Sequence, residues 1–335
     1  MHTEARLAYN SFLQRQEQLN GVPSARESFT VVPSVQQTLE SKMQESSALL
    51  AAINVIGVRE MSGEKLGLGI TGPIASRTNT ATTDRSPRSV ETLDNTTYAC
   101  KQTNYDTAIK YAVLDAWAKF PDFQTRLRDL IIKRQALDRI VIGLNGVSAA
   151  VATNLATYPL LQDVNIGWLQ HIRTDAPTRV MDEGAVPGAV SVGASGDYKN
   201  LDALVFDAAQ TLLDPWYQND GGLVAIVGRT LMHDKLFPLV SDPTAPTEML
   251  AADIVRSQRR LGGLQAITVP YFPANTVLIT RLDNLSIYYQ SSSRRRSIID
   301  NPKRDQIENL ESSNDAFVVE DYGLCALVEN IVIAD

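Results

Sequence analysis

Residues 122–144 read DFQTRLRDLIIKRQALDRIVIGL, and this stretch predicts a long amphipathic helix, the strongest element of the chain. Pro121 precedes the stretch and Asn145-Gly146 follows it, which is typical of a helix start and a helix stop. At a rise of 1.5 Å per residue the helix would be roughly 33 Å long, enough to span a domain. The apolar residues recur at steps of three and four: Phe123, Leu127, Leu130, Leu137, Val141 and Leu144, with Ile131 and Ile140 widening the stripe. We expect Leu130 and Leu137 to be core residues that face a sheet.

The region before this helix has a different composition. From Ser62 to Asn104, Gly, Ser, Thr, Asn and Asp crowd together and apolar residues are scattered. The stretch LGLGITGPIASRT places apolar residues at every second position, which predicts a weakly packed strand that leads to a polar tip at about 79–89. An irregular stretch of this length is uncommon inside a compact domain. We therefore expect an extended two-stranded arm that is stabilised by something outside the subunit.

The amino terminus predicts a short amphipathic helix over residues 3–19, with Thr3 as its N-cap and Asn20-Gly21-Val22-Pro23 as its end. Such a helix must dock on its own chain or bind a partner, because a short helix is marginal alone in water. The rest of the chain alternates helix and strand signals, a mixed α+β pattern with a second lobe inserted between the long helix and the last strands. Helices are expected at about 34–50, 201–213, 230–239 and 248–258, and strands at about 53–58, 223–228, 266–269, 276–280, 316–322 and 325–334.

Composition limits the class of protein. The chain has 335 residues, 44% hydrophobic and 21% charged residues and a net charge of −7, which is normal for a globular protein and unlike a protein that grips nucleic acid through a basic excess. The two cysteines, Cys100 and Cys325, and the lack of a signal-like segment indicate a reducing cytoplasm. No stretch is apolar enough to span a membrane.

Motifs that would indicate an enzyme are weak. Gly67-Leu-Gly69-Ile-Thr-Gly72 matches the dinucleotide fingerprint, but Pro73 and polar sequence follow it where a helix is required. The three histidines, His2, His171 and His233, have no metal-ligand spacing, and no serine lies in a G-x-S-x-G elbow. We predict no catalytic residue, no cofactor and no metal site.

Two basic clusters remain. The long helix carries cations interleaved with carboxylates, which is typical of a solvated or intersubunit face: Arg126, Arg128, Lys133, Arg134 and Arg139, with Asp122, Asp129 and Asp138. The second cluster is Arg294, Arg295 and Arg296. It fits equally an exposed loop and a set of intersubunit salt bridges to the arm of a neighbour.

Long, irregular segments of this chain resemble the major capsid proteins of P2-type tailed bacteriophages. They include MQESSALLAAINVIGVREMSGEKLGLGITGPIASRT (43–78), LDAWAKFPDFQTRLRDLIIKRQALDRIVIGLNG (114–146), EMLAADIVRSQRRLGGLQAITVPYFP (248–273) and NPKRDQIENLESSNDAFVVEDYGLCALVEN (301–330). The resemblance covers nearly the whole chain. It implies the HK97-like capsid fold, an α+β fold with an amino-terminal arm, an extended E-loop, a peripheral domain with a long spine helix, and an axial domain.

Carried onto this sequence, the resemblance implies the following limits. The amino-terminal arm is 1–60, the E-loop is 61–105, the peripheral domain is 106–200 and 290–335 with the spine helix at 122–144, and the axial domain is 201–289. It also implies a structural protein, not an enzyme, that assembles in the bacterial host cytoplasm and becomes part of the virion.

The implied partners are other copies of the chain in hexamers and pentamers, an internal scaffold and protease protein, a portal protein, and packaged double-stranded DNA that is enclosed without sequence-specific binding. The resemblance further implies that a protease removes the first 29 or so residues at Ser28, Phe29 and Thr30. An alternative from another class is the shell of an encapsulin-like nanocompartment, which would hold a cargo protein in place of DNA.

Overall fold

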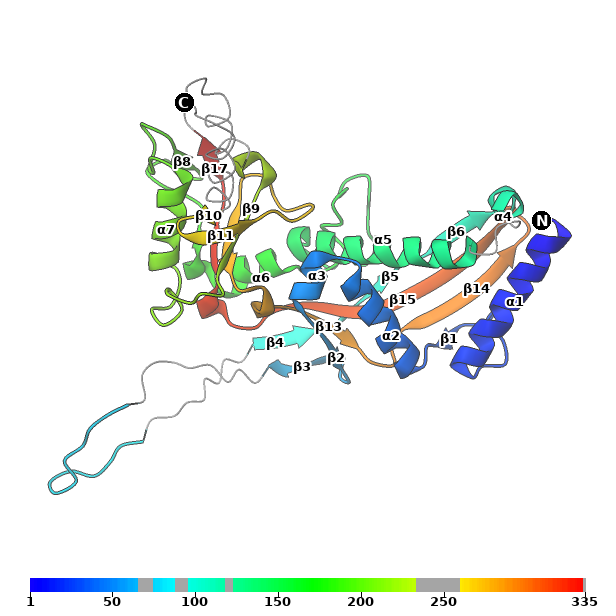
Figure 1. The fold of residues 1–335 in the computed structure, drawn as a ribbon, viewed down its shortest axis with the longest axis horizontal. Helices are drawn as coiled ribbons and strands as arrows, with labels where there is room; N and C mark the ends of the chain where they lie inside the picture. The colour runs from blue at the N-terminus through cyan, green and yellow to red at the C-terminus, as the bar shows by residue number, and fades with distance from the viewer. Residues whose placement is uncertain (66–74, 88–95, 118–122, 233–259, 334–335) are drawn as a thin grey trace, which may run out of the picture. The chain divides into compact units, whose positions relative to one another are not determined.

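The computed structural model describes residues 1–65, 75–87, 96–117, 123–232 and 260–333. By internal contacts the chain divides into two compact units (Figure 1). Unit 1 comprises Met1–Met61, Ala99–Trp168 and Ser286–Val318, and unit 2 comprises Ser62–Tyr98, Leu169–Leu285 and Val319–Asp335. The domain limits implied by the resemblance concern roles in an assembly, and they stay predictions.

Unit 1 is built on a seven-stranded sheet with the order β1-β14-β15-β13-β2, in which β5 and β6 also pair with β15. The sheet is held together by β15, a strand of 14 residues that pairs antiparallel with β14 over seven positions. Its strands are β1 (Phe29–Thr30), β2 (Asn54–Val58), β5 (Lys101–Asn104), β6 (Thr107–Lys110), β13 (Leu285–Gln290), β14 (Arg295–Asn301) and β15 (Gln306–Val319).

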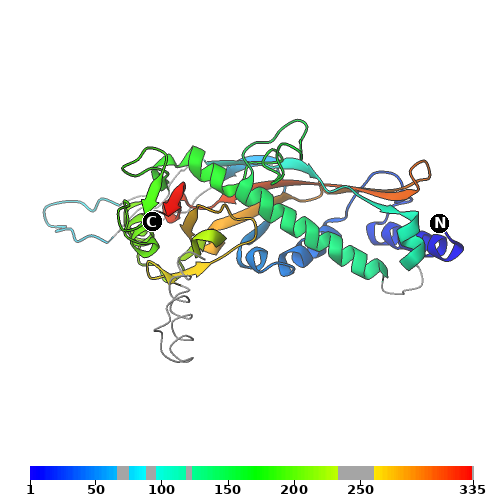
Figure 2. The ribbon, with the colours of Figure 1, turned by 90° about the horizontal axis from the view of Figure 1, so that it is seen from above.

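The long helix predicted from residues 122–144 is confirmed as α5 (Phe123–Asn145), which runs along the sheet of unit 1 (Figures 1 and 2). The other helices of unit 1 are α1 (Thr3–Asn20), α2 (Pro33–Glu45), α3 (Ala48–Ala52) and α4 (Tyr111–Trp117). The single helix expected at 34–50 is split into α2 and α3, because Ser46 and Ser47 end the first helix and the Ser46 hydroxyl bonds back to the Met43 carbonyl.

The face that α5 buries differs from the predicted one. Leu130 is 65% exposed and Leu137 is only partly buried, so the expectation that Leu130 is a core residue is wrong. The side chains that α5 buries begin at Ile132 and include the polar residues Gln135 and Arg139. The others are Ala136, Ile140, Val141, Ile142 and Leu144. The helix is turned toward this face because its polar members bond to other buried polar groups of unit 1.

The amino-terminal helix docks on its own chain. Tyr9 and Leu13 of α1 are buried in a cluster with Phe29, Ile298 and Ile307, and Gly21 ends the helix in the left-handed conformation. This packing gives α1 the partner that a short helix needs. Leu7 and Leu19 of α1 are exposed.

Unit 2 contains a six-stranded sheet with the order β10-β11-β9-β12-β16-β7, and α7 (Leu201–Thr211) packs on its core. Asn200 caps α7 by accepting a hydrogen bond from the Ala203 amide. The strands of the sheet are β7 (Val180–Met181), β9 (Val224–Val227), β10 (Arg260–Leu261), β11 (Leu264–Ile267), β12 (Val277–Thr280) and β16 (Ala326–Val328). The remaining elements are β3 (Ser62–Lys65), β4 (Thr96–Ala99), β8 (Val190–Val192), β17 (Ile331–Ile333), α6 (Trp168–Asp175) and the short 3₁₀ turns 177–179, 282–284 and 322–324.

The last two strands belong to unit 2 and not to the part of the chain that carries the long helix. Strand β16 pairs antiparallel with β12, and β17 pairs parallel with β8. The expected return of 325–334 to the peripheral domain stays a prediction. Strand β12 pairs with β9 along one edge and with β16 along the other, and apolar residues of β16 belong to the core of unit 2. The helices expected at 230–239 and 248–258 lie largely outside the described residues.

Candidate functional site

A buried network of charged side chains joins three parts of unit 1. Arg139 of α5 donates to both carboxylate oxygens of Glu40 on α2, and it also bonds to Asp315 of β15 at 3.1 Å. Arg294, just before β14, donates to Glu311 at 2.7 Å and to the same Glu40 at 3.1 Å. Glu40 is therefore shared by both guanidinium groups.

Neutral polar groups complete this network. Gln135 accepts from Arg294 at 2.8 Å and donates to Glu311 at 3.1 Å. The hydroxyls of Ser313 and Tyr105 donate to Asp315. Arg139 and Arg294 are only 2% and 1% exposed, so the ion pairs are shielded from solvent. Breaking such a buried pair is costly, because a charge is left without a partner.

This geometry corrects the interpretation of two sequence clusters. Arg294 does not lie in an exposed loop, because it is buried and its guanidinium pairs with Glu40 and Glu311 of its own chain. Arg139 likewise does not belong to a solvated face of the long helix. The surface character holds for Arg128, which pairs with the exposed Asp129, and for Arg134, which is exposed and pairs with the partly buried Asp138.

The other two arginines of the cluster differ from Arg294. Arg296 bonds to Asn309 and Gln16 and lies over the Phe12 ring, so it joins β14 to α1. Arg295 is exposed. The intersubunit role expected for the three arginines stays a prediction, and Arg295 is the one whose side chain is exposed in the single chain.

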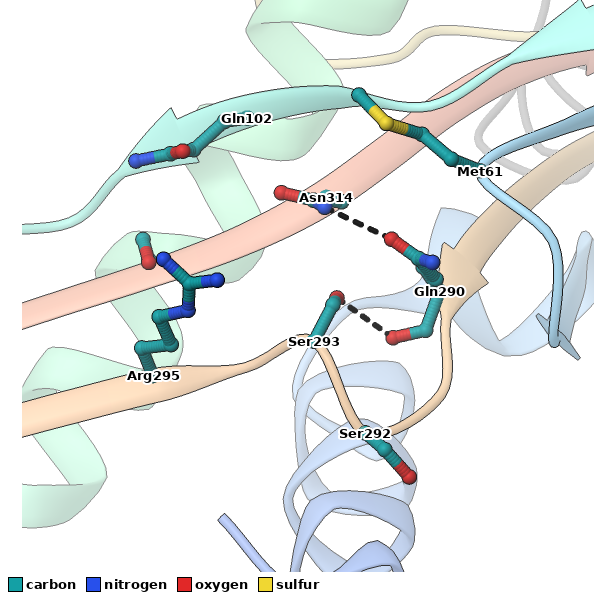
Figure 3. Close-up of a pocket in the computed structure, with 8 residues that line it drawn as sticks. Met61, Gln102, Gln290, Ser292, Ser293, Arg295 and Asn314 are labelled. Atoms are coloured by element: carbon teal, nitrogen blue, oxygen red, sulfur yellow. Dashed lines mark hydrogen bonds between the residues drawn. The ribbon is translucent and has the colours of Figure 1, made fainter. Parts of the chain in front are cut away.

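Arg295 lies at a polar notch of about 310 Å³ in unit 1 (Figure 3). The notch lies at the serine-rich turn between β13 and β14, where Ser293 and Asn314 both bond to Gln290. Its lining offers hydrogen-bond donors and acceptors and a single charge: Met61, Gln102, Gln290, Ser292, Ser293, Arg295, Ser312 and Asn314. Its lining, in the part of the chain that the structure describes, includes no histidine or carboxylate beside the serines.

The expected processing segment forms part of the sheet. Phe29 and Thr30 make up β1, which pairs with β14 at Arg296 and Arg295, and the Phe29 side chain is buried. Ser28, directly before β1, is exposed.

Other features of the described ranges indicate no chemistry. No group of three or more His, Cys, Asp or Glu side chains could hold a metal ion there. The helices in those ranges are all too short or too polar to cross a membrane. The fingerprint Gly67–Gly72 falls outside them. Cys100 and Cys325 are both buried and form no disulfide with each other.

The network gives a pH dependence. Burial opposes ionisation of Glu311, but the nearby charges of Arg294 and Arg296 and the hydrogen bonds from Arg294 and Gln135 outweigh it and lower its pKa below the ordinary value of 4.5. A carboxylate with a lowered pKa contributes stability that is present above pH 4.5 and is lost as the pH falls through the folded-state pKa.

We therefore expect the free energy of unfolding to fall as the pH drops below about 4.5, with a smaller fall in Glu311→Gln. Urea titrations of the unassembled subunit between pH 7 and pH 3 measure this. Glu45→Gln removes an exposed carboxylate on α2 and is the matched control. An equal pH dependence in wild type and Glu311→Gln would contradict the assignment.

Comparison with known proteins decides what kind of protein carries this architecture. The family model "Phage major capsid protein, P2 family" matches residues 8–331, almost the whole chain. The chain belongs to this family. Members are structural capsid proteins and not enzymes, so this chain is a phage major capsid protein and a component of the virion.

Individual relatives agree with the family. The chain is 51% identical to "Capsid proteins" of Escherichia phage P2, over 100% of this chain and 96% of the relative. It is 40% identical to the "Major capsid protein" of Serratia phage KSP20, over 100% and 98% of the two chains.

Solved structures place the fold. A chain of the satellite phage P4 procapsid, solved with a size determination (Sid) protein, matches with a TM-score of 0.83 and 47% identity over 100% of this chain and 99% of that one. The capsid of an empty GTA particle matches with a TM-score of 0.54 and 17% identity over 86% and 90%, which shows the fold alone. The HK97-like α+β fold expected from the sequence is confirmed, and capsid proteins of this fold assemble into oligomeric shells.

Proposed function

We propose that this capsid protein forms hexamers and pentamers that close an icosahedral head around double-stranded DNA. The observation that carries the proposal is the family match over residues 8–331 together with the 47% identical chain found in a procapsid. The net charge of −7 fits a wall that encloses DNA without gripping it. The encapsulin-like alternative has less support, because the relatives at 40% and 51% identity are phage capsid proteins.

We assign the contacts between copies in part to the arm at 61–105, the expected E-loop. Strands β3 and β4 form an isolated two-stranded ribbon at its base, with Tyr98 packed over Gly63. A ribbon of two strands is marginal in water unless it packs on something else. Residues 75–87 of the arm contain no buried side chain, so the described part of their own chain does not pack against them.

Replacing residues 75–87 by a short Gly-Ser linker tests this role. We expect the free energy of unfolding of the subunit to change by less than about 0.5 kcal/mol, because no buried contact is lost. The yield of particles should fall at least tenfold, measured by sedimentation on a gradient. Ser86→Ala alters one exposed side chain of the same segment and should assemble like wild type. Normal particle yield from the replacement variant would refute the assignment.

We further propose that an internal scaffold and protease protein, and a portal protein at one vertex, take part in assembly in the bacterial cytoplasm. The exposed Leu7 and Leu19 of α1 are apolar side chains that a scaffold could contact, while Tyr9 and Leu13 hold the helix on its own chain. Cleavage at Ser28, Phe29 and Thr30 would require β1 to leave β14, since proteases need an extended and accessible chain. Processing is thus coupled to release of α1 from unit 1.

Mass spectrometry of the capsid protein from infectious virions tests the processing step. We expect the mass of the chain without its first 29 or so residues, and no peptide from residues 1–20. The same peptides should be present in unassembled protein expressed without the protease. A full-length chain at full stoichiometry in virions would contradict the proposal.

A further inference from the structure

An ordered and uncharged loop follows the long helix in unit 1. It runs from Val147 to Gln162, and its ends meet where the amides of Val147 and Ser148 donate to the Gln162 carbonyl at 2.7 and 3.1 Å. Beneath this junction the chain crosses itself closely, because a Cβ on Gly146 would lie 2.2 Å from the carbonyl oxygen of Asn165. A compact surface loop with adjoining ends is often a functional element.

A buried carboxylate fixes the interior of the loop. Asp163 is 4% exposed and accepts from the Asn154 amide at 2.6 Å, and its carbonyl accepts from the Ala150 amide. Asn154 in turn accepts from the amides of Ala156 and Thr157. The backbone of the loop is therefore held in one conformation before any partner binds, which lowers the entropic cost of binding.

The loop turns apolar side chains outward. Its exposed large hydrophobic residues are Val147, Val151, Leu155 and Tyr158, and Val151 is fully exposed. Their own chain leaves these side chains in water, although the loop is well ordered by hydrogen bonds. Four exposed large apolar side chains within one short, hydrogen-bonded loop favour a role for the loop in binding another surface.

Charge indicates what covers this surface. Residues 140–162 contain no Asp, Glu, Lys, Arg or His, whereas the whole chain carries a net charge of −7. Nucleic acid or an oppositely charged protein would find no ion pair here. Two copies of an acidic chain repel each other over most of their surface, and an uncharged apolar loop is a place where they can approach without that cost.

We propose that the loop 147–162 is a contact between copies of this chain in the shell, with Val151 and Leu155 buried against an apolar surface of the adjacent copy. The inference rests on the proposed shell. It adds a second contact that is formed by unit 1 and is separate from the arm.

Charge insertion tests the inference. Val151→Asp/Leu155→Asp should unfold like wild type in urea, because both side chains are exposed, yet its particle yield should fall at least tenfold. Val151→Thr/Leu155→Thr places neutral polar groups at the same positions and should assemble within twofold of wild type. Particles formed by the Asp variant at wild-type yield would overturn the inference while leaving the shell function standing.

Photo-crosslinking identifies the occupant. Benzoylphenylalanine placed at Leu155 in the full-length chain should yield, on irradiation of assembled particles, a product of twice the 36.7 kDa subunit mass. The same protein should give no such product when unassembled. A crosslink only to the scaffold or to another protein would overturn the assignment to a second copy. If wild-type protein forms no shell under any condition, the proposed function fails and the inference fails with it.

Discussion

Arg139→Ala should destabilise the subunit by about 3–5 kcal/mol, because it leaves Glu40 and Asp315 buried without their main counter-charge. Among the described residues, Glu40 then keeps Arg294 as its one cationic partner, and Asp315 keeps neutral donors such as Ser313 and Tyr105. A loss of this size is a large fraction of the stability of an ordinary domain, so much of the variant should be insoluble.

Urea unfolding of the soluble fraction measures the effect. Arg128→Ala is the matched control, since Arg128 lies on the same helix and pairs with Asp129 at the surface. That pair should contribute less than about 1 kcal/mol. Equal stabilities of the two variants would show that the network around Arg139 is not important for folding.

Ile140→Ala should destabilise the subunit by about 2–5 kcal/mol, and Leu130→Ala by less than about 0.5 kcal/mol. Ile140 is a fully buried residue of α5, whereas Leu130 of the same helix is 65% exposed in the single chain. Both substitutions remove aliphatic groups from the same helix, so helix propensity affects them similarly. Thermal or urea unfolding distinguishes them, and a costly Leu130→Ala would mean that Leu130 is a core residue after all.

The long helix could be predicted because its signal is local. Apolar residues at steps of three and four, with Pro121 before them and Gly146 after them, determine a helix regardless of the rest of the chain. The same local pattern could not say which side of the helix is buried. The apolar residues of α5 spread over more than one face, and the choice between faces depends on partners elsewhere in the sequence.

Those partners have no sequence signal of their own. Glu40 lies 99 positions from Arg139, and Asp315 lies 176 positions from it. Charged residues are rarely buried unless they are paired, so a basic run such as Arg294-Arg295-Arg296 is reasonably assigned to the surface. The structure instead gives the three consecutive arginines three different surroundings. Arg294 turns into the network, Arg295 faces solvent, and Arg296 reaches α1.

The arm shows the opposite case, in which composition alone was informative. Residues 75–87 have too few apolar side chains to form a core, and the structure leaves them exposed. A sequence rich in Thr, Ser and Asn therefore predicted a segment without internal support. What supports the arm cannot be read from a single chain, which is why its role is assigned to contacts between copies.

Electron microscopy of the full-length protein, expressed with and without its scaffold, tests the central claim most directly. The account predicts closed shells of uniform size with fivefold vertices when the scaffold is present, and two-dimensional classes in which each subunit contacts its neighbours. Free subunits or amorphous aggregates under every condition, or shells filled with a cargo protein in place of DNA in infected cells, would contradict it.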